Sequence, residues 1–146
     1  MPATPKQPKE LLLPQELETF YILPALRHIL AQELHLLGKK QKDIAEIFGI
    51  TSATISQYKS NKRGSQITFP PDIKVEICKT ASKIHDRYTY IKEIQHLLHL
   101  LKTTNILCQI HHKLNNLPIN CHPKNIGCGI TIPKLAPKTP ILKLHP

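Results

Sequence analysis

A basic segment near the middle of the sequence carries small, hydroxyl and amide side chains that could bind DNA. From Gly49 to Gly64 it contains no acidic residue. Small side chains let a helix approach the major groove closely, and an amide can pair with a base edge there. Lysine and arginine bind the phosphates of the DNA backbone. The residues that we assign to this DNA-contacting surface are Gln41, Thr51, Ser52, Ala53, Ser56, Gln57, Lys59, Lys62 and Arg63.

A second group of side chains, late in the sequence, could bind a metal. Cys108 and His111 are three residues apart, and Cys121 and Cys128 follow. Thiolate and imidazole groups are ligands of tetrahedral zinc, and cysteine thiolates hold iron–sulfur clusters. Six residues, Pro123 among them, separate the last two cysteines, which is a wider gap than zinc motifs usually have. The alternative is a histidine-rich polar surface whose cysteines bind no metal.

Two short helices and a tight turn must position the first group. Ile44, Ala45 and Phe48 recur at helical spacing, which predicts a first helix that begins near Gln41. Gly49 can adopt the positive φ that ends a helix and turns the chain. The turn then leads directly into the basic segment.

The second helix is expected over Ser52 to Ser60. Ile50 can fill the corner before it, and the Thr51 hydroxyl can cap its first turn. Ile55 and Tyr58 would face inward. This order of elements is typical of a helix-turn-helix, whose second helix enters the major groove. Amphipathic helices joined at a glycine also occur in many other helical proteins, which is the alternative interpretation.

Apolar stripes predict further helices on both sides of this motif. The first stripe has Pro24 in its first turn and follows a separate short helix over Glu16 to Tyr21. A second helix begins at Pro70 and Pro71. The first stripe consists of Leu23, Leu26, Leu30, Leu34 and Leu37, and the second of Ile77, Ala81, Ile84 and Tyr88.

Two more helices are predicted, over Tyr90 to Lys102 and over Ile106 to Leu114. The apolar face of the first consists of Ile91, Ile94, Leu98 and Leu101, widened by Leu97 and Leu100. So wide a face could serve the core and a second subunit, as in a homodimer on a two-fold DNA site. It could equally serve the core alone, and both interpretations remain open.

Prolines cluster at both ends of the chain, and the regular fold should lie between them because proline blocks helix interiors. We predict a disordered Pro-rich segment over 1–14 and a helix-turn-helix domain over 15–69. C-terminal helices for packing or dimerisation should cover 70–117, and an irregular basic tail 118–146. Residues 65–69 form either an extended connector or an edge strand. The expected fold is an all-α, compact helical bundle.

Composition favours an anionic partner. The chain has 20 Lys and Arg against 10 Asp and Glu, a net charge of +10. Residues 39–64 carry six basic and two acidic side chains, and 103–146 carry five lysines and no carboxylate. Nucleic acid and an anionic membrane surface both fit this charge. Because the sequence lacks a membrane-spanning apolar run and a signal peptide, we expect a cytoplasmic protein without a membrane partner.

No motif in the sequence predicts catalysis. It contains no glycine-rich phosphate loop and no nucleophile elbow, and its carboxylates are scattered. We therefore expect neither an enzyme nor a small-molecule substrate. The cofactors that the sequence indicates are zinc or an iron–sulfur cluster at the late cysteines and His111.

Two stretches of the sequence resemble a known family. LPQELETFYILPALRHILAQEL, followed by KKQKDIAEIFGITSATISQYKSNKRG, is similar to the archaeal predicted transcriptional regulators with an Xre-type helix-turn-helix. The resemblance covers about Leu13 to Leu114. It implies a lambda-repressor-like, all-helical fold and a homodimeric, sequence-specific regulator of transcription. It also implies that Gln41 contacts phosphate and that Ser52, Ala53 and Gln57 face bases.

The resemblance is incomplete at the cysteines. Members of the family carry a Cys where this chain has Gln15, and a Cys-x2-Cys pair where it has Gln95 and Leu98. Their later cysteine and histidine match Cys108 and His111. A metal-sensing or redox role that the family implies is therefore only partly matched.

The sequence thus predicts a sequence-specific DNA-binding transcriptional regulator. One alternative is a metal-binding sensor or adaptor in which the late Cys and His residues form the working site. In that case the two short helices would be only an interaction surface. Another is a basic protein that coats nucleic acid without specificity through its lysine-rich tail.

Overall fold

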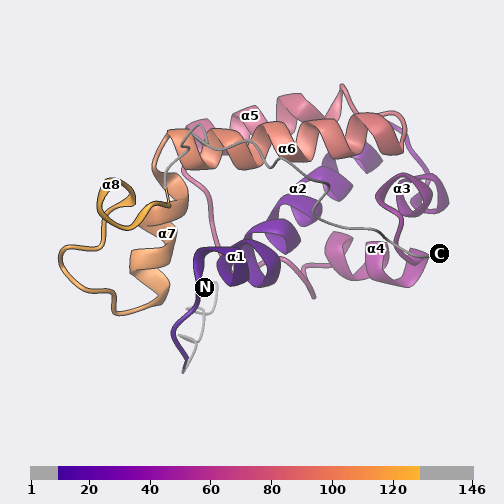
Figure 1. Cartoon of the computed structure of the whole chain (residues 1–146). Helices are drawn as coiled ribbons and strands as arrows, with labels where there is room; N and C mark the ends of the chain where they lie inside the picture. The colour runs from indigo at the N-terminus through magenta and orange to yellow at the C-terminus, as the bar shows by residue number, and fades with distance from the viewer. Residues whose placement is uncertain (1–9, 129–146) are drawn as a thin grey trace, which may run out of the picture.

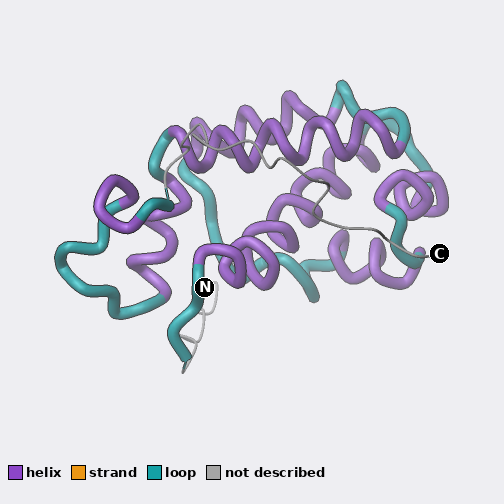
Figure 2. Tube along the Cα trace, in the orientation of Figure 1, coloured by secondary structure: helices purple, strands orange, loops and turns teal. Residues whose placement is uncertain are grey.

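The computed structural model describes residues 10–128, and every regular element in that range is a helix (Figure 1). The elements are α1 (Pro14–Leu17), the π-helical turn η1 (Glu18–Ile22), α2 (Leu23–Leu36), α3 (Gln41–Phe48), α4 (Ser52–Lys59), α5 (Pro71–Ala81), α6 (Arg87–Thr103), α7 (Ile106–Leu114) and α8 (Pro123–Ile126). Residues 65–69 form a loop, as Figure 2 shows, and not a strand. The predicted all-helical fold class is confirmed. None of these helices is both long and apolar enough to cross a membrane.

α1, η1 and α2 follow one another without a break, where the sequence predicted a separate short helix before Pro24. The N–H of Leu23 donates to the carbonyl of Glu18, a bond that spans five residues. Proline has no N–H, and in a regular α-helix its ring collides with the carbonyl four residues earlier. A wider π-turn just before Pro24 relieves this conflict, so the helix continues to Leu36.

One hydrophobic core joins the N-terminal and C-terminal parts of the chain. α2 packs against α3, α4 and α5, and the core contains residues of every helix from α1 to α7. Leu26, Leu30 and Leu34 of the predicted stripe are fully buried, and each contributes roughly 1.5–3 kcal/mol. Leu37 is exposed because α2 ends before it. The predicted segments 15–69 and 70–117 therefore pack on one another.

The turn between α5 and α6 overturns two expectations from the apolar stripes. α5 ends at Ala81 and α6 begins at Arg87, so the helical phase changes between them. Ile84 is buried in the turn, but Tyr88 and Ile91 face solvent with 74% and 59% of their surface exposed. The apolar residues that α6 does bury are Tyr90, Ile94, Leu97 and Leu101. The stripe predictions were wrong at Tyr88 and Ile91.

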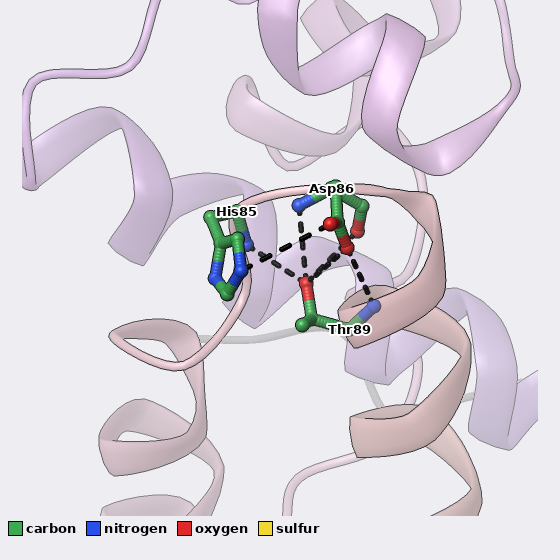
Figure 3. A network of polar contacts seen from close by, with 3 residues as sticks. All are labelled: His85, Asp86 and Thr89. Carbon is green, nitrogen blue, oxygen red and sulfur yellow. Dashed lines mark hydrogen bonds and ion pairs between the residues drawn. The ribbon is translucent and has the colours of Figure 1, made fainter.

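A hydrogen-bond network fixes the start of α6. Oδ1 of Asp86 accepts from the backbone N–H of Thr89 at 2.7 Å (Figure 3). Oγ1 of Thr89 accepts in turn from the backbone N–H groups of His85 and Asp86, each at 3.0 Å. These reciprocal bonds form a capping box, which satisfies N–H groups that the first turn leaves unpaired.

The first turn of α6 also holds α3 in place. Nε of Arg87 donates to the carbonyl of Glu46 at 2.8 Å. The rings of Phe48 and Tyr90 stack with their centroids 4.4 Å apart. Such aromatic pairs contribute about 0.5–1.5 kcal/mol beyond the area that they bury. α3 is therefore supported by α6 as well as by α2.

Residues 10–14 belong to the fold, although the sequence predicted a disordered segment over 1–14. Leu12 is buried, and its N–H donates to Oδ1 of Asn115 at 3.0 Å. Nδ2 of Asn115 donates to the carbonyl of Glu10 at 3.3 Å. α1 then begins at Pro14. The side chain of Asn115 thus ties the start of the described chain to the end of α7.

The predicted irregular tail is described only as far as Cys128. This part contains the short helix α8, whose first turn is capped by Nδ1 of His122, which accepts from the N–H of Lys124 at 3.2 Å. Gly127 ends α8 with φ +78°. Residues 129–146 of the predicted tail lie outside the described residues, as do residues 1–9.

Candidate functional site

The turn between α3 and α4 forms as its sequence predicts. Gly49 caps α3 with φ +66°, and its N–H donates to the carbonyl of Glu46 at 3.2 Å. Nothing lies within 4 Å of the position that a Cβ of Gly49 would take. Glycine is therefore needed here for its backbone conformation, because an L side chain rarely adopts positive φ. Ile50, which follows, is half-buried against the core.

α4 begins after a Thr51 cap and is anchored by two buried side chains. Oγ1 of Thr51 accepts from the backbone N–H of Thr54 at 3.2 Å. Ile55 is fully buried and Tyr58 retains only 2% exposure. The helix ends at Lys59 with Ser60 as its cap, one residue before the predicted end. Packing of these inward residues fixes which face of α4 remains outside.

The outward face of α4 collects four of the nine residues predicted to contact DNA. Ser52, Ala53, Ser56 and Gln57 are all exposed. They occupy successive turns on the side opposite Ile55, as a period of 3.6 residues requires. Lys59 is half-buried at the end of the helix.

Gln41 makes a contact that the sequence did not predict. Its Nε2 donates to the carbonyl of Ser52 at 2.9 Å and lies 3.1 Å from Oγ of the same residue. The first residue of α3 therefore supports the first residue of α4. The side-chain oxygen of Gln41 has no hydrogen-bond partner among the described residues. No local sequence signal marks a pairing between the first residues of two consecutive helices.

The basic loop after α4 returns to the body of the protein through Gly64. Asn61 has φ +61°, and the N–H groups of Lys62 and Arg63 both donate to the carbonyl of Gln57, at 3.0 and 3.2 Å. Gly64 has φ +80°, and a Cβ there would collide with the carbonyl of Pro24 in α2. The loop is thus held against α2 by a close backbone approach.

Three cationic side chains border a hollow beside this loop. Lys62 and Arg63 are exposed, and the Arg63 guanidinium lies 5.9 Å from the centre of the Tyr58 ring. Arg27 of α2 lines the same hollow, and its Nε donates to the phenol of Tyr90 at 3.1 Å. Burial acts to lower the pKa of Arg27, but the bonds and charges of Tyr90 and Tyr58 outweigh it and raise the pKa. Arg27 was not among the residues that the sequence predicted to contact DNA.

The structure brings the four predicted metal ligands to one cavity at the other end of the molecule (Figure 1). Cys108 and His111 come from α7, Cys121 from the loop before α8, and Cys128 from the residues after α8. The cavity has a volume of about 50 Å³. Within residues 10–128, however, no three His, Cys, Asp or Glu side chains converge closely enough to hold a single metal ion.

The surroundings of this cavity affect the Cys108 thiol. Burial raises the pKa of Cys108, and the charges of Cys121 and Cys128 raise it further. Cys108 and Cys121 are half-buried and Cys128 is exposed. Nε2 of His111 lies 2.7 Å from the carbonyl of Leu12. Because a carbonyl can only accept, that nitrogen carries the proton.

Comparisons of the chain with models of protein families, with curated proteins and with solved structures find no match.

Proposed function

We propose that the chain is a sequence-specific DNA-binding regulator of transcription, in which α3 and α4 form a helix-turn-helix. The observation that carries the proposal is the outward face of α4. Its exposed side chains are small at the start of the helix and an amide one turn later, while Ile55 and Tyr58 anchor the opposite face. A helix with this surface can lie in the major groove without displacing large side chains.

Gln57 is the residue best suited to read a base. Its side chain is exposed and makes no hydrogen bond to another described residue. A glutamine amide can donate to and accept from an adenine edge at the same time. Ser52 and Ser56 lie on the same face and can bond base edges or phosphate. Thr51 and Ala53 allow close approach at the first turn.

The loop after α4 supplies the contacts to the DNA backbone. Lys62 and Arg63 extend from it, and Arg27 lies beside them at the hollow. Cations bind phosphate whatever the base sequence, so these residues set affinity and orientation. The Gln41 amide is engaged with Ser52, and we therefore assign Gln41 a positioning role with its oxygen free to accept.

The proposed regulator binds as a homodimer in the cytoplasm. The exposed Tyr88 and Ile91 on α6 are apolar surface that a second copy would cover. Two copies related by a two-fold axis would place two α4 helices on a palindromic site.

Two variants, one on α4 and one in the loop that follows it, test the proposal. A preferred DNA sequence is first selected from a random pool with the full chain. Gln57→Ala should relax the preference at one base position by about 1–3 kcal/mol. Lys62→Ala should weaken all sequences alike and reduce the slope of affinity against salt by about 1.

Gln109→Ala, at an exposed position on α7, is the matched control and should change neither property. If the chain binds random and selected sequences equally, and Gln57→Ala changes nothing, the protein coats nucleic acid without specificity and the proposal fails.

A further inference from the structure

We propose that the hollow between η1 and the loop after α4 binds a small molecule that joins a phosphate group to an aromatic ring, as a nucleoside monophosphate does. The bound molecule occupies Lys62 and Arg63 and so keeps the DNA backbone away from them. Binding of the small molecule stands by itself, whereas the exclusion of DNA rests on the proposed function.

The first argument is the positive charge around the hollow, which no carboxylate offsets. Arg27, Lys62 and Arg63 line the hollow, and no acidic residue of the described chain does. The ion pairs formed within residues 10–128 involve none of these three cations. Nε of Arg27 donates to a phenol, that of Tyr90, and not to a carboxylate. Three such cations attract an anion, and phosphate can bond several of their N–H groups at once.

The second argument is a set of unpaired donors beside the cations. Gly64 and Ser65 line the hollow, and their backbone N–H groups donate to no acceptor among the described residues. Gly64 has φ +80°, and N–H groups in such turns form concave sites for anions. The exposed amide of Gln66 also lines the hollow and makes no hydrogen bond within the same range. These donors suit the several acceptor oxygens of a phosphate group.

The third argument is the aromatic wall that η1 supplies. The π-helical turn brings Thr19, Phe20 and Tyr21 to the hollow. Phe20 has 59% of its surface exposed, and Tyr21 is half-buried. Covering such a ring with a ligand ring is favourable, and nucleic-acid bases stack well on aromatic side chains. Since a backbone phosphate of DNA needs no aromatic partner, this wall favours a ligand that carries its own ring.

The fourth argument is the size of the hollow and the rigidity of its border. Its volume is about 460 Å³, within the roughly 300–1,000 Å³ of typical ligand sites. The backbone of Gly64 lies so close to the carbonyl of Pro24 that a Cβ would collide with it. The Arg63 guanidinium lies 5.9 Å from the centre of the Tyr58 ring. These contacts position the loop before a ligand binds.

Calorimetric titration of the full chain with each of the common ribonucleoside monophosphates tests the site. At least one of them should bind at least about fivefold more tightly than inorganic phosphate at the same ionic strength, because its ring adds stacking to the phosphate contacts. If no nucleotide binds, or if inorganic phosphate binds as tightly as every nucleotide, the proposal is overturned.

Variants of the hollow locate the bound nucleotide. Phe20→Ala should weaken nucleotide binding by at least about fivefold and leave phosphate binding unchanged. Because Phe20 is exposed, the loss of its ring should not disturb the fold. Leu36→Ala is the matched control, since Leu36 is an exposed apolar residue of α2 that does not line the hollow. Lys62→Ala should weaken nucleotide and phosphate alike. Unchanged nucleotide affinity in Phe20→Ala overturns the assignment.

A DNA titration in the presence of the nucleotide tests the exclusion of DNA. At ten times the Kd of the nucleotide, competition should lower the DNA affinity of the unaltered protein about tenfold, and that of Phe20→Ala only about threefold. Unchanged DNA affinity overturns the exclusion. A chain that binds nucleotide but no DNA retains the small-molecule site and refutes the proposed function. A chain that binds DNA but no nucleotide refutes the small-molecule site alone.

Discussion

The surface of α4 and the cavity of α7 and α8 present their side chains in opposite ways. On α4 the assigned residues face solvent, and buried Ile55 and Tyr58 hold the helix from behind. At the cavity the four residues predicted as metal ligands line one small hollow. A surface that binds a large partner works best when it is rigid and already exposed, because ordering it on binding costs free energy. A site for a small ligand needs only to surround it.

The two regions are joined by shared supports. α6 packs on α3 near its start and on α7 near its end. The α3–α4 region depends on backbone turns, chiefly at Gly49 and Gly64, whereas the cavity depends on side-chain bonds of His111 and Asn115. Substitutions of each kind should therefore affect one region and spare the other.

Gly64→Ala should have the largest effect. A Cβ at this position collides with the Pro24 carbonyl and the residue keeps positive φ, so we expect a loss of about 3 kcal/mol in the free energy of unfolding and a loss of DNA binding. Urea unfolding measures the first and a binding titration the second.

Gly127→Ala is the control in the other region. Gly127 has nearly the same φ, but nothing lies within 4 Å of its Cβ position, so only the backbone strain of about 1 kcal/mol applies. Equal losses for the two variants would show that the close approach to α2 contributes nothing.

Asn115→Ala should come next and should act on the cavity region. It leaves the buried N–H of Leu12 and the carbonyl of Glu10 without their partner, which costs about 1–3 kcal/mol. Asn116→Ala, at the exposed neighbour, should leave unfolding unchanged. DNA affinity should stay at the level of the unaltered protein at a temperature where the variant is folded. A large fall in DNA affinity would show that the two regions are not separable.

Thr51→Ala should have a smaller effect, confined to α4. It removes the oxygen that accepts from the Thr54 N–H, at a cost of about 1 kcal/mol to stability. Thr51→Ser keeps that oxygen and should restore most of the loss. If both variants unfold at the same urea concentration, the methyl group of Thr51, and not its capping hydroxyl, contributes the stability.

Asp86→Asn should have the smallest effect, a small loss of stability at pH 7 that disappears in acid. Backbone and side-chain bonds from Thr89 lower the pKa of Asp86 in the folded chain. Because the folded pKa lies below the unfolded value of about 3.9, the ionised Asp86 carboxylate stabilises the folded state above that value. This stabilisation is lost as the pH falls below it. The variant should therefore show a weaker loss of stability than the unaltered protein as the pH falls below that value. Thermal unfolding at pH 7 and in acid compares the two slopes.

Sequence patterns predicted the helices of the α3–α4 region well because their signals are local. Gly49, Thr51 and the inward Ile55 and Tyr58 all lie within a few residues of the turn that they shape. The boundaries of α7 were predicted for the same reason. The prediction failed at Tyr88, where a short turn changed the helical phase and an apolar residue was left outside.

By itself, the sequence determined the helical class, the turn at Gly49, and the supply of amide, cationic and thiol side chains. The tertiary structure alone decided which of them meet. The N–H of Leu12 donates to Oδ1 of Asn115 across 103 positions, and Arg27 lines the same hollow as Lys62. These contacts depend on how whole helices pack around α2, and that packing is a sum over many distant side chains which no local pattern contains.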